Sequence, residues 1–254
     1  QPASDTVCDA GLNEPSLFCL GKTERMKLVI ANKAYSSWSL RPWILMKMLD
    51  LPFTEDVIPL DTPDFRPRVD AYQAGSTVPI LVDGDVTVWE SLAIMDYLAD
   101  CYPDKAVWPS DKKARAFART ISNEMHAGFR ALRQACPMNV RKIHPAKARG
   151  EAVDKDVARI TALWTKALTL YGKPSGAGPF LFGAFSAADA MFAPVVTRLV
   201  TFSIPVDATS RAYCEAVLKT PVFRQWHQEA MAEPWVVAHD EADEPVLAPF
   251  TIPV

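Results

Sequence analysis

The sequence lacks the closely spaced cysteines or histidines of a metal site. Its five cysteines, at positions 8, 19, 101, 136 and 214, are odd in number and widely separated. Zinc sites and disulfide frameworks instead bring cysteines together in recognisable spacings. We therefore expect no metal site, a reducing compartment and a cytoplasmic location.

Long apolar runs and an excess of charge of one sign are also missing. Pro194, Arg198 and Pro205 interrupt the longest apolar region, so no segment approaches the roughly 20 apolar residues of a membrane helix. A formal net charge of -3 provides no broad positive field for nucleic acid. We expect a small-molecule partner rather than a nucleic acid or a membrane.

The first 25 residues lack the pattern of a secretory signal. They mix Pro, Ser, Asp and Gly and contain no basic segment followed by a long apolar one. We expect residues 1–25 to form a flexible extension, with the folded part of the chain starting at Met26.

Residues 26–104 alternate between strand and helix patterns, as an α/β domain does. Pro42 suits the first turn of the first helix, because proline has no N–H to donate. Asp83-Gly84 is a hairpin turn signal between two short strands. The expected elements are a strand at 27–31, a helix at 40–49, a strand at 53–60, a hairpin of 79–82 with 86–88, and a helix at 90–99.

Residues 110–234 read as an all-helical domain. Ser186 and Asp189 stand three residues apart before an apolar segment, which is the spacing of a capping box. The tail at 235–254 is rich in proline and acidic residues and is expected to be irregular. The expected helices are 114–135, 146–171, 187–200, 209–218 and 222–231.

Four short motifs, in this order and on these elements, resemble the cytosolic glutathione transferase family. They are Ser36-Ser37-Trp38-Ser39-Leu40-Arg41, Val78-Pro79, Glu90-Ser91 and Ser186-Ala187-Ala188-Asp189. The resemblance extends from Met26 to about Pro234 and is nearest to bacterial serine-type, zeta-like members. It implies an α/β thioredoxin-like N-terminal domain at 26–104 and an all-α helical C-terminal domain at 110–234.

The same resemblance implies a glutathione S-transferase with a role in detoxification. Such an enzyme takes glutathione as co-substrate and holds it as a thiolate for attack on a small electrophile. Members usually pair as two-fold homodimers. The sequence by itself shows no dimer interface.

The loop before the first helix holds the candidate catalytic hydroxyls. Only the thiolate attacks well, and a hydroxyl that donates to sulfur near a helix N-terminus favours that form. Ser36 precedes Arg41 by five positions, the spacing of the catalytic serine and helix arginine in zeta-like and tau-like members. Ser36 is therefore preferred, with Ser37 and Tyr35 as alternatives, or with the serines acting only as helix caps.

The resemblance assigns glutathione binding to Thr77, Val78, Pro79, Glu90 and Ser91. In the family the Val-Pro peptide is cis and leaves the backbone before proline free to pair with the cysteinyl part of glutathione. Ser91 opens a helix, whose free N–H groups suit the γ-glutamyl carboxylate. Glu90 would face the ammonium group. The alternatives are an ordinary trans proline and a simple helix cap.

The electrophile pocket is expected to include Trp38, Met125, His126 and Phe129. The last three, with Arg130 and Arg133, recur at helical spacing on one helix. Such an apolar stripe is more often protein core than pocket, so both interpretations stay open.

Two other functions compete with the transferase. One is a glutathione-dependent isomerase of the maleylacetoacetate type, although zeta members have Ser-Ser-Cys where this chain has Ser36-Ser37-Trp38. The other is a non-catalytic binding module, since a fold does not determine function. Retention on immobilised glutathione would separate this module from both enzymes.

Overall fold

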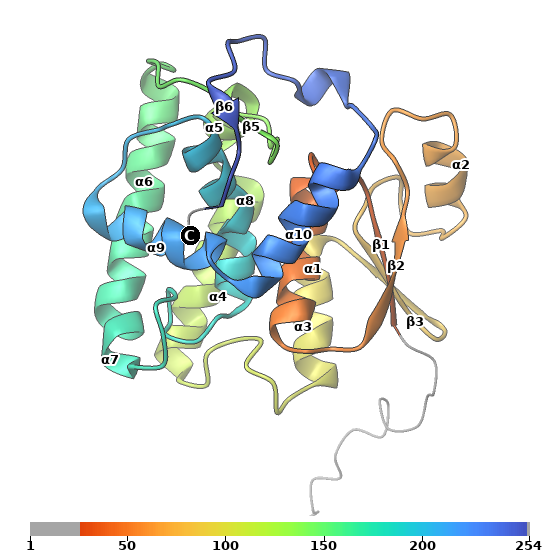
Figure 1. Ribbon diagram of the computed structural model, residues 1–254. Helices are drawn as coiled ribbons and strands as arrows, with labels where there is room; N and C mark the ends of the chain where they lie inside the picture. The colour runs from red at the N-terminus through yellow and green to blue at the C-terminus, as the bar shows by residue number, and fades with distance from the viewer. Residues whose placement is uncertain (1–25, 253–254) are drawn as a thin grey trace, which may run out of the picture.

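A four-stranded mixed sheet forms the first half of the chain in this computed structural model, which describes residues 26–252 (Figure 1). The extension predicted at 1–25 lies outside the described residues. The strand order is β2-β1-β3-β4, with β1 parallel to β2 and the other pairs antiparallel. The strands are β1 (Met26–Ile30), β2 (Phe53–Val57), β3 (Ile80–Asp83) and β4 (Val86–Trp89).

Each face of this sheet is covered by helices. Leu28 and Ile30 of β1 belong to the main core, whereas Val29 lies in a second cluster on the opposite face, as the alternation of side chains in a strand requires. Figure 1 shows α2 (Phe65–Asp70) outside the sheet and two helices on its inner side. These inner helices are α1 (Ser37–Met48) and α3 (Ser91–Cys101).

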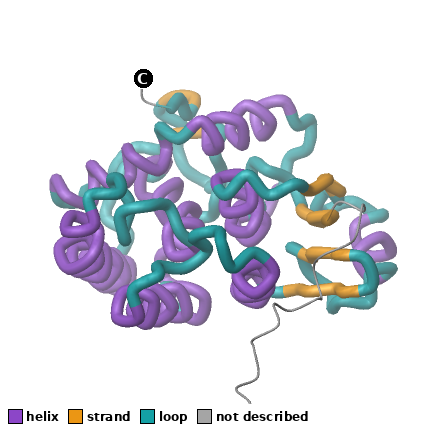
Figure 2. The backbone as a smooth tube through the Cα atoms, turned by 90° about the horizontal axis from the view of Figure 1, so that it is seen from below, coloured by secondary structure: helices purple, strands orange, loops and turns teal. Residues whose placement is uncertain are grey.

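The second half of the chain is almost entirely helical (Figure 2). Helix α8 is buried along nearly its whole length and packs against α1 and α4. The domain limits 26–104 and 110–234 stay a prediction. The helices are α4 (Lys112–Ala127), α5 (Arg130–Ala135), α6 (Glu151–Ala167), η1 (Leu168–Gly172), α7 (Lys173–Ser175), α8 (Ala187–Thr201), α9 (Ala208–Leu218) and α10 (Pro221–Ala232).

Three helices differ from the sequence prediction, and one of them, expected at 146–171, begins only at Glu151 and ends in the π-helical turn η1. The helix expected at 114–135 breaks into α4 and α5, because Phe129 takes a left-handed conformation with φ of 55°. Helix α1 begins at Ser37, three residues earlier than expected. Pro42 therefore lies inside the helix rather than in its first turn, and it cannot donate a hydrogen bond to the carbonyl of Trp38.

The tail after α10 is more ordered than predicted. It contains a short 3₁₀ turn, η2 (Ala238–Asp240), and a strand, β6 (Ala248–Pro249), that pairs with β5 (Lys142–Ile143). Figure 1 shows it rising from α10 beside β1 and crossing to the helical half. Within residues 26–252, no helix is long and apolar enough to span a bilayer.

A buried carboxylate fixes the start of α8. Asp189 accepts the N–H of Ser186 at 2.9 Å, the N–H of Leu181 at 3.0 Å and the hydroxyl of Tyr213 at 3.1 Å. The predicted link between Ser186 and Asp189 is therefore present. Burial raises the pKa of Asp189 to about 6, although these hydrogen bonds oppose the shift.

We predict that Asp189→Ala lowers the free energy of unfolding by about 3 kcal/mol or more. The change leaves two buried N–H groups and two buried hydroxyls, those of Tyr213 and Ser186, without their acceptor, and each such loss costs about 1–3 kcal/mol. Urea unfolding followed by tryptophan fluorescence measures the loss. A loss below about 1 kcal/mol would contradict this role of Asp189.

Asp189→Asn serves as the non-titrating control. Because the pKa of Asp189 is raised in the folded protein from 3.8 to about 6, the stability contributed by its protonated form is lost as the pH rises through this interval. The stability of Asp189→Asn relative to wild type should then increase by up to about 3 kcal/mol between pH 4 and pH 7. A difference independent of pH would contradict the shift.

Candidate functional site

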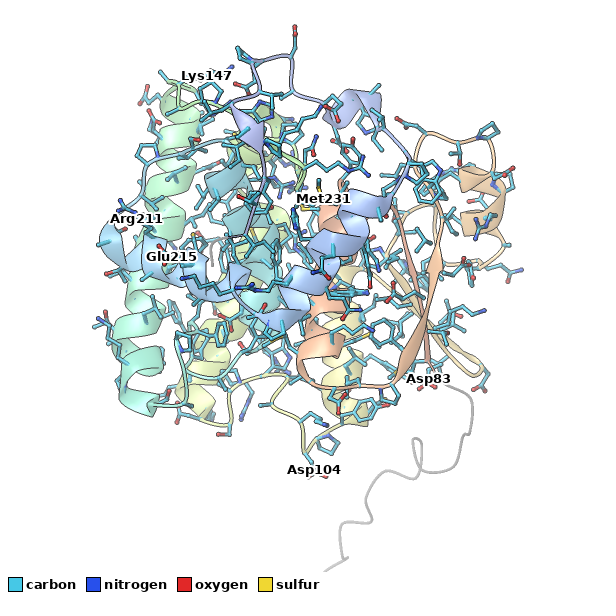
Figure 3. The ribbon with its side chains drawn as sticks, in the orientation of Figure 1. Asp83, Asp104, Lys147, Arg211, Glu215 and Met231 are labelled. Carbon is cyan, nitrogen blue, oxygen red and sulfur yellow. The ribbon has the colours of Figure 1, made fainter. Side chains whose placement is uncertain are left out.

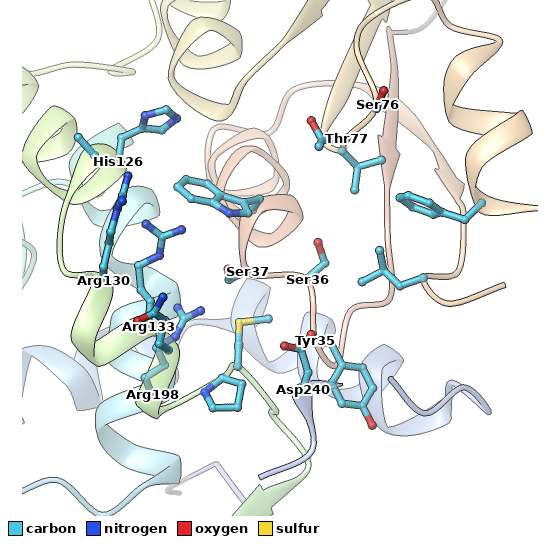
Figure 4. A pocket seen from close by; sticks show the side chains of 18 residues that line it. Tyr35, Ser36, Ser37, Ser76, Thr77, His126, Arg130, Arg133, Arg198 and Asp240 are labelled. Atoms are coloured by element: carbon cyan, nitrogen blue, oxygen red, sulfur yellow. The ribbon is translucent and has the colours of Figure 1, made fainter. Parts of the chain in front are cut away.

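A cavity of about 840 Å³ lies between the sheet half and the helical half (Figure 4). The loop between β1 and α1, the loop before β3 and the segment from α4 to α5 supply most of its walls. The tail contributes Asp240, and α8 contributes Arg198. Leu60 and Phe65, between β2 and the start of α2, complete the lining, so six segments of the sequence meet at one cavity.

Ser36 lines the cavity at the N-terminus of α1. Its hydroxyl donates to Ser39 Oγ at 2.7 Å, and Ser39 Oγ accepts the N–H of Ala31 at 3.0 Å. Ser36 is the N-cap residue of the helix. Its side chain thus stands where the partial positive charge of the helix dipole is greatest.

The two alternative hydroxyls also lie at the cavity. Ser37 is half-buried, and its carbonyl accepts from Arg41 Nη1 at 2.8 Å. Tyr35 donates its hydroxyl to Glu241 Oε1 at 2.6 Å. Burial, followed by the hydrogen bond and charge of Glu241, raises the pKa of Tyr35 to about 12. The Tyr35 hydroxyl is therefore already hydrogen-bonded to Glu241 of the tail, whereas Ser36 and Ser37 line the cavity.

The loop before β3 forms the opposite wall. Ser76, Thr77 and Val78 line the cavity, whereas Pro79 does not. The Val78-Pro79 peptide is cis, as the resemblance implies. Strand pairing with β1 starts at Ile80, so Val78 lies just ahead of the paired backbone.

Glu90 and Ser91 lie at the start of α3 and are not lining residues of the cavity. Glu90 has φ of 69°, an uncommon conformation for a residue with a side chain. Its carboxylate lies 3.2 Å from His126 Nε2. Ser91 is buried, with its hydroxyl 3.8 Å from the Met191 sulfur.

The predicted electrophile residues divide into two groups. Trp38 and His126 line the cavity and meet edge to face, with ring centroids 5.1 Å apart. Met125 and Phe129 are buried in the main core and do not line it. His126, Arg130 and Arg133 line the cavity together at spacings of four and three residues, whereas Met125 and Phe129 each stand one residue earlier and point into the core.

Arginine side chains gather on the helical wall of the cavity. Arg130, Arg133 and Arg198 line it, and Figure 4 shows them side by side across from Ser76 and Thr77. The helical spacing of Arg130 and Arg133 predicted that these two side chains lie close together. No sequence motif indicated that Arg198 would join them.

Glu233, at the C-terminal end of α10, was also missed by sequence reasoning. Glu233 accepts the N–H of Lys33 at 2.7 Å and the N–H of Ala34 at 3.1 Å, in the loop that carries Ser36. Burial raises the pKa of Glu233, while these two hydrogen bonds lower it. Contacts that span about 200 residues of sequence leave no pattern in a local window.

Residues 35–101 match the family model of the glutathione S-transferase N-terminal domain. A dichloromethane dehalogenase of Methylophilus leisingeri is 41% identical over 64 residues, which are 23% of each chain. A probable maleylacetoacetate isomerase of Caenorhabditis elegans is 32% identical over 97 residues, 38% of this chain and 44% of that one. The chain thus spans about a quarter of the length of the dehalogenase and less than half of the length of the isomerase.

Among solved structures, a glutathione transferase homologue from Burkholderia GL BGR1 with bound glutathione superposes with a TM-score of 0.62 and 23% identity. The match covers 83% of this chain and 100% of that chain. The chain therefore has the glutathione transferase fold, with a thioredoxin-like α/β domain followed by an all-α domain, as the sequence predicted.

We predict that Glu233→Ala frees the loop before α1. Two backbone N–H groups lose their acceptor, which costs about 2 kcal/mol or more. Hydrogen exchange read by mass spectrometry should show faster exchange in the peptide covering Lys33 and Ala34, with the rest of the sheet unchanged.

Two variants serve as controls for this loop. Glu233→Gln keeps one acceptor oxygen and should show an intermediate effect. Glu215→Ala removes an exposed glutamate of α9, labelled in Figure 3 and paired with Lys219, and should leave the loop unchanged. Equal exchange in Glu233→Ala and Glu215→Ala would contradict the role of Glu233.

Proposed function

We propose that this chain is a glutathione transferase that holds the glutathione sulfur as a thiolate at the N-terminus of α1 for attack on a small electrophile. The observation that carries the proposal is the place of Ser36. It caps α1 and faces the cavity, on a fold that a related structure uses to bind glutathione.

Ser36 would stabilise the thiolate by donating its hydroxyl to sulfur. In the structure that hydroxyl donates to Ser39 Oγ at 2.7 Å, and rotation about one bond redirects it towards a ligand. A donor and a helix N-terminus acting together favour the charged form of the thiol. The enzyme then accelerates the reaction by thiolate stabilisation and proximity, with no covalent enzyme intermediate.

The rest of glutathione would lie along the loop before β3 and the start of α3. Thr77 and Val78 line the cavity, and the unpaired backbone of Val78 before Pro79 suits the cysteinyl part. The free N–H groups at Ser91 suit the γ-glutamyl carboxylate. Glu90 would then accept the ammonium group in place of its present contact with His126.

Tyr35 fits the thiolate role less well than the serines. Its hydroxyl already donates to Glu241, and a pKa raised to about 12 makes it a weaker donor to sulfur. Ser37 keeps its place as the alternative, because its side chain lines the cavity beside Ser36.

The electrophile side of the proposal now rests on Trp38 and His126. Both line the cavity, Trp38 from α1 and His126 from α4. The proposed roles of Met125 and Phe129 would be indirect, since both are buried behind that wall.

A cytoplasmic location, a homodimer and a part in detoxification belong to the same proposal. Cys136 and Cys214 are buried thiols rather than disulfides, which suits a reducing compartment. Pairing of two copies is supported by the resemblance to the family.

An isomerase that recycles glutathione is the second candidate. The serine pair and the similarity to a probable maleylacetoacetate isomerase favour it, while Trp38 in place of cysteine disfavours it. Conjugation consumes one glutathione per turnover, whereas isomerisation consumes none, so a thiol balance separates them. A non-catalytic module without the site would not bind immobilised glutathione.

We predict that bound glutathione has a thiol pKa well below the usual 8.5, and that Ser36→Ala raises it by about 1–2 units. Thiolate absorbance of the complex measured against pH tests this. The value of kcat/KM for conjugation should fall about 100-fold at neutral pH, in the range seen when one donor to a developing charge is removed.

Ser37→Ala and Tyr35→Phe are the matched controls. Each should leave the thiol pKa within about 0.3 units of wild type if Ser36 is the donor. Loss only in Ser37→Ala would move the role to that residue. A normal thiol pKa in wild-type complex would overturn the transferase proposal.

We predict separately that Ser91→Ala weakens glutathione binding about tenfold, because the hydroxyl bond to a carboxylate is lost. Calorimetry with S-methylglutathione measures binding without turnover. Ser110→Ala, an exposed serine outside the cavity, should bind as wild type. Unchanged affinity in Ser91→Ala would remove that hydroxyl from the glutathione site.

A further inference from the structure

Four arginines, two of them packed on the Trp38 ring, have no ion pair to any carboxylate of residues 26–252. The Arg41 guanidinium lies 4.1 Å from the Trp38 ring centroid, and that of Arg133 lies 4.9 Å from it. Arg198 and Arg130 complete the group, which we call the arginine cluster.

Two members of the arginine cluster are deeply buried. Arg41 is fully buried, and its Nη2 has no hydrogen-bond partner within the described part of the chain. Arg198 is 5% exposed, and among the described residues its side chain donates to the carbonyls of Cys136 at 2.9 Å and Pro194 at 3.3 Å. Buried cations are ordinarily paired with anions, because desolvation is costly.

Repulsion adds to this cost. Burial and the charges of Arg198 and Arg133 lower the pKa of Arg41, and burial with the charge of Arg130 lowers that of Arg133. The pKa of Arg198 is lowered to about 10 by burial and then by Arg133. An anion in the cavity would relieve both effects.

The single carboxylate among the residues that line the cavity is Asp240. It attracts Arg198 electrostatically but lies beyond ion-pair distance, and burial raises its own pKa. One carboxylate against three lining arginines leaves the helical wall with a positive excess.

The arginine cluster lies across the cavity from the proposed glutathione wall. Figure 4 places Arg130 and Arg133 on one side, and Ser76, Thr77 and Ser36 on the other. Apolar side chains of Leu60, Phe65 and Met138 also line the space. A ligand that meets both the sulfur and the arginines would combine a small apolar body with an anionic end.

We propose that the second substrate is a small electrophile that carries a carboxylate, held by Arg130 and Arg133. This inference rests on the proposed transferase function and names its substrate class. Guanidinium groups bind carboxylates through paired, charge-assisted hydrogen bonds. Arg198 and Arg41 contribute charge from behind this pair.

A suitable probe is 4-chloro-3-nitrobenzoate, with 4-chloro-3-nitrobenzamide as its neutral counterpart. Glutathione loses its thiol proton to solvent, and its sulfur forms a bond to the carbon that bears chlorine. The carbon–chlorine bond breaks, chloride leaves with the electron pair, and the carboxylate is unchanged. Each kcat/KM is divided by the uncatalysed rate with glutathione to remove intrinsic reactivity.

The experiment compares the acid-to-amide ratio of these normalised values in wild type and in Arg130→Gln/Arg133→Gln. We expect the ratio to fall about 100-fold in the double variant, or about tenfold for each charged hydrogen bond lost. Asp240→Asn should raise the ratio, because it removes the one carboxylate that competes for the arginines. Arg211→Gln, far away on α9 in Figure 3, removes one positive charge, as each substitution of the double variant does, and should leave the ratio as in wild type.

Calorimetry with 3-nitrobenzoate and 3-nitrobenzamide, which lack the leaving group, keeps the inference testable without turnover. If wild type binds the acid more tightly than the amide, and Arg130→Gln/Arg133→Gln loses this preference, the inference is supported, even if the thiol pKa test fails. Equal binding of acid and amide to wild type would overturn it. An unchanged acid-to-amide ratio with weaker S-methylglutathione binding in the double variant would also overturn it, and would assign the arginines to glutathione.

Discussion

The burial of helix α1 along its central two turns is the constraint on which the site depends. Every residue from Ser39 to Met46 is buried, because the sheet lies on one side of the helix and α8 on the other (Figure 1). Even Arg41 is enclosed here, with its Nε donating to the Met191 carbonyl of α8 at 3.1 Å. A helix held on all sides cannot shift along its axis, so its N-terminus and Ser36 keep a fixed place at the cavity.

The chain after α10 closes the same site from a distance. Arg141 donates to the carbonyls of Ala230, Trp235 and Glu233, which holds the tail as it leaves the helix. The carboxylate of Glu233 then binds the loop before Ser36. The loop is therefore fixed by two parts of the structure, α1 on one side and the tail on the other. This arrangement suits a site that must hold a hydroxyl in one position relative to a ligand.

How far the sequence predicts this molecule depends on the range of the interactions involved. Periodicity identified the four strands and most helices, since side-chain burial repeats within a few residues. It failed at Phe129, where a left-handed residue breaks an otherwise helical pattern. The serine loop and the wall at Val78 could be placed through short motifs. Arg198 and Asp240 could not, because only the packing of α8 and the tail brings them to the cavity.

The charges of the cavity suit a thiolate as well as a carboxylate. Positive groups near a thiol favour its ionised form, and Arg133 and Arg198 line the cavity that Ser36 faces. The two effects differ in how they depend on the second substrate. A field that acts on sulfur changes the reaction of every electrophile by the same factor, whereas a bond to a carboxylate changes only the anionic one. The ratio between an acid and its amide therefore isolates recognition, and the thiol pKa isolates activation.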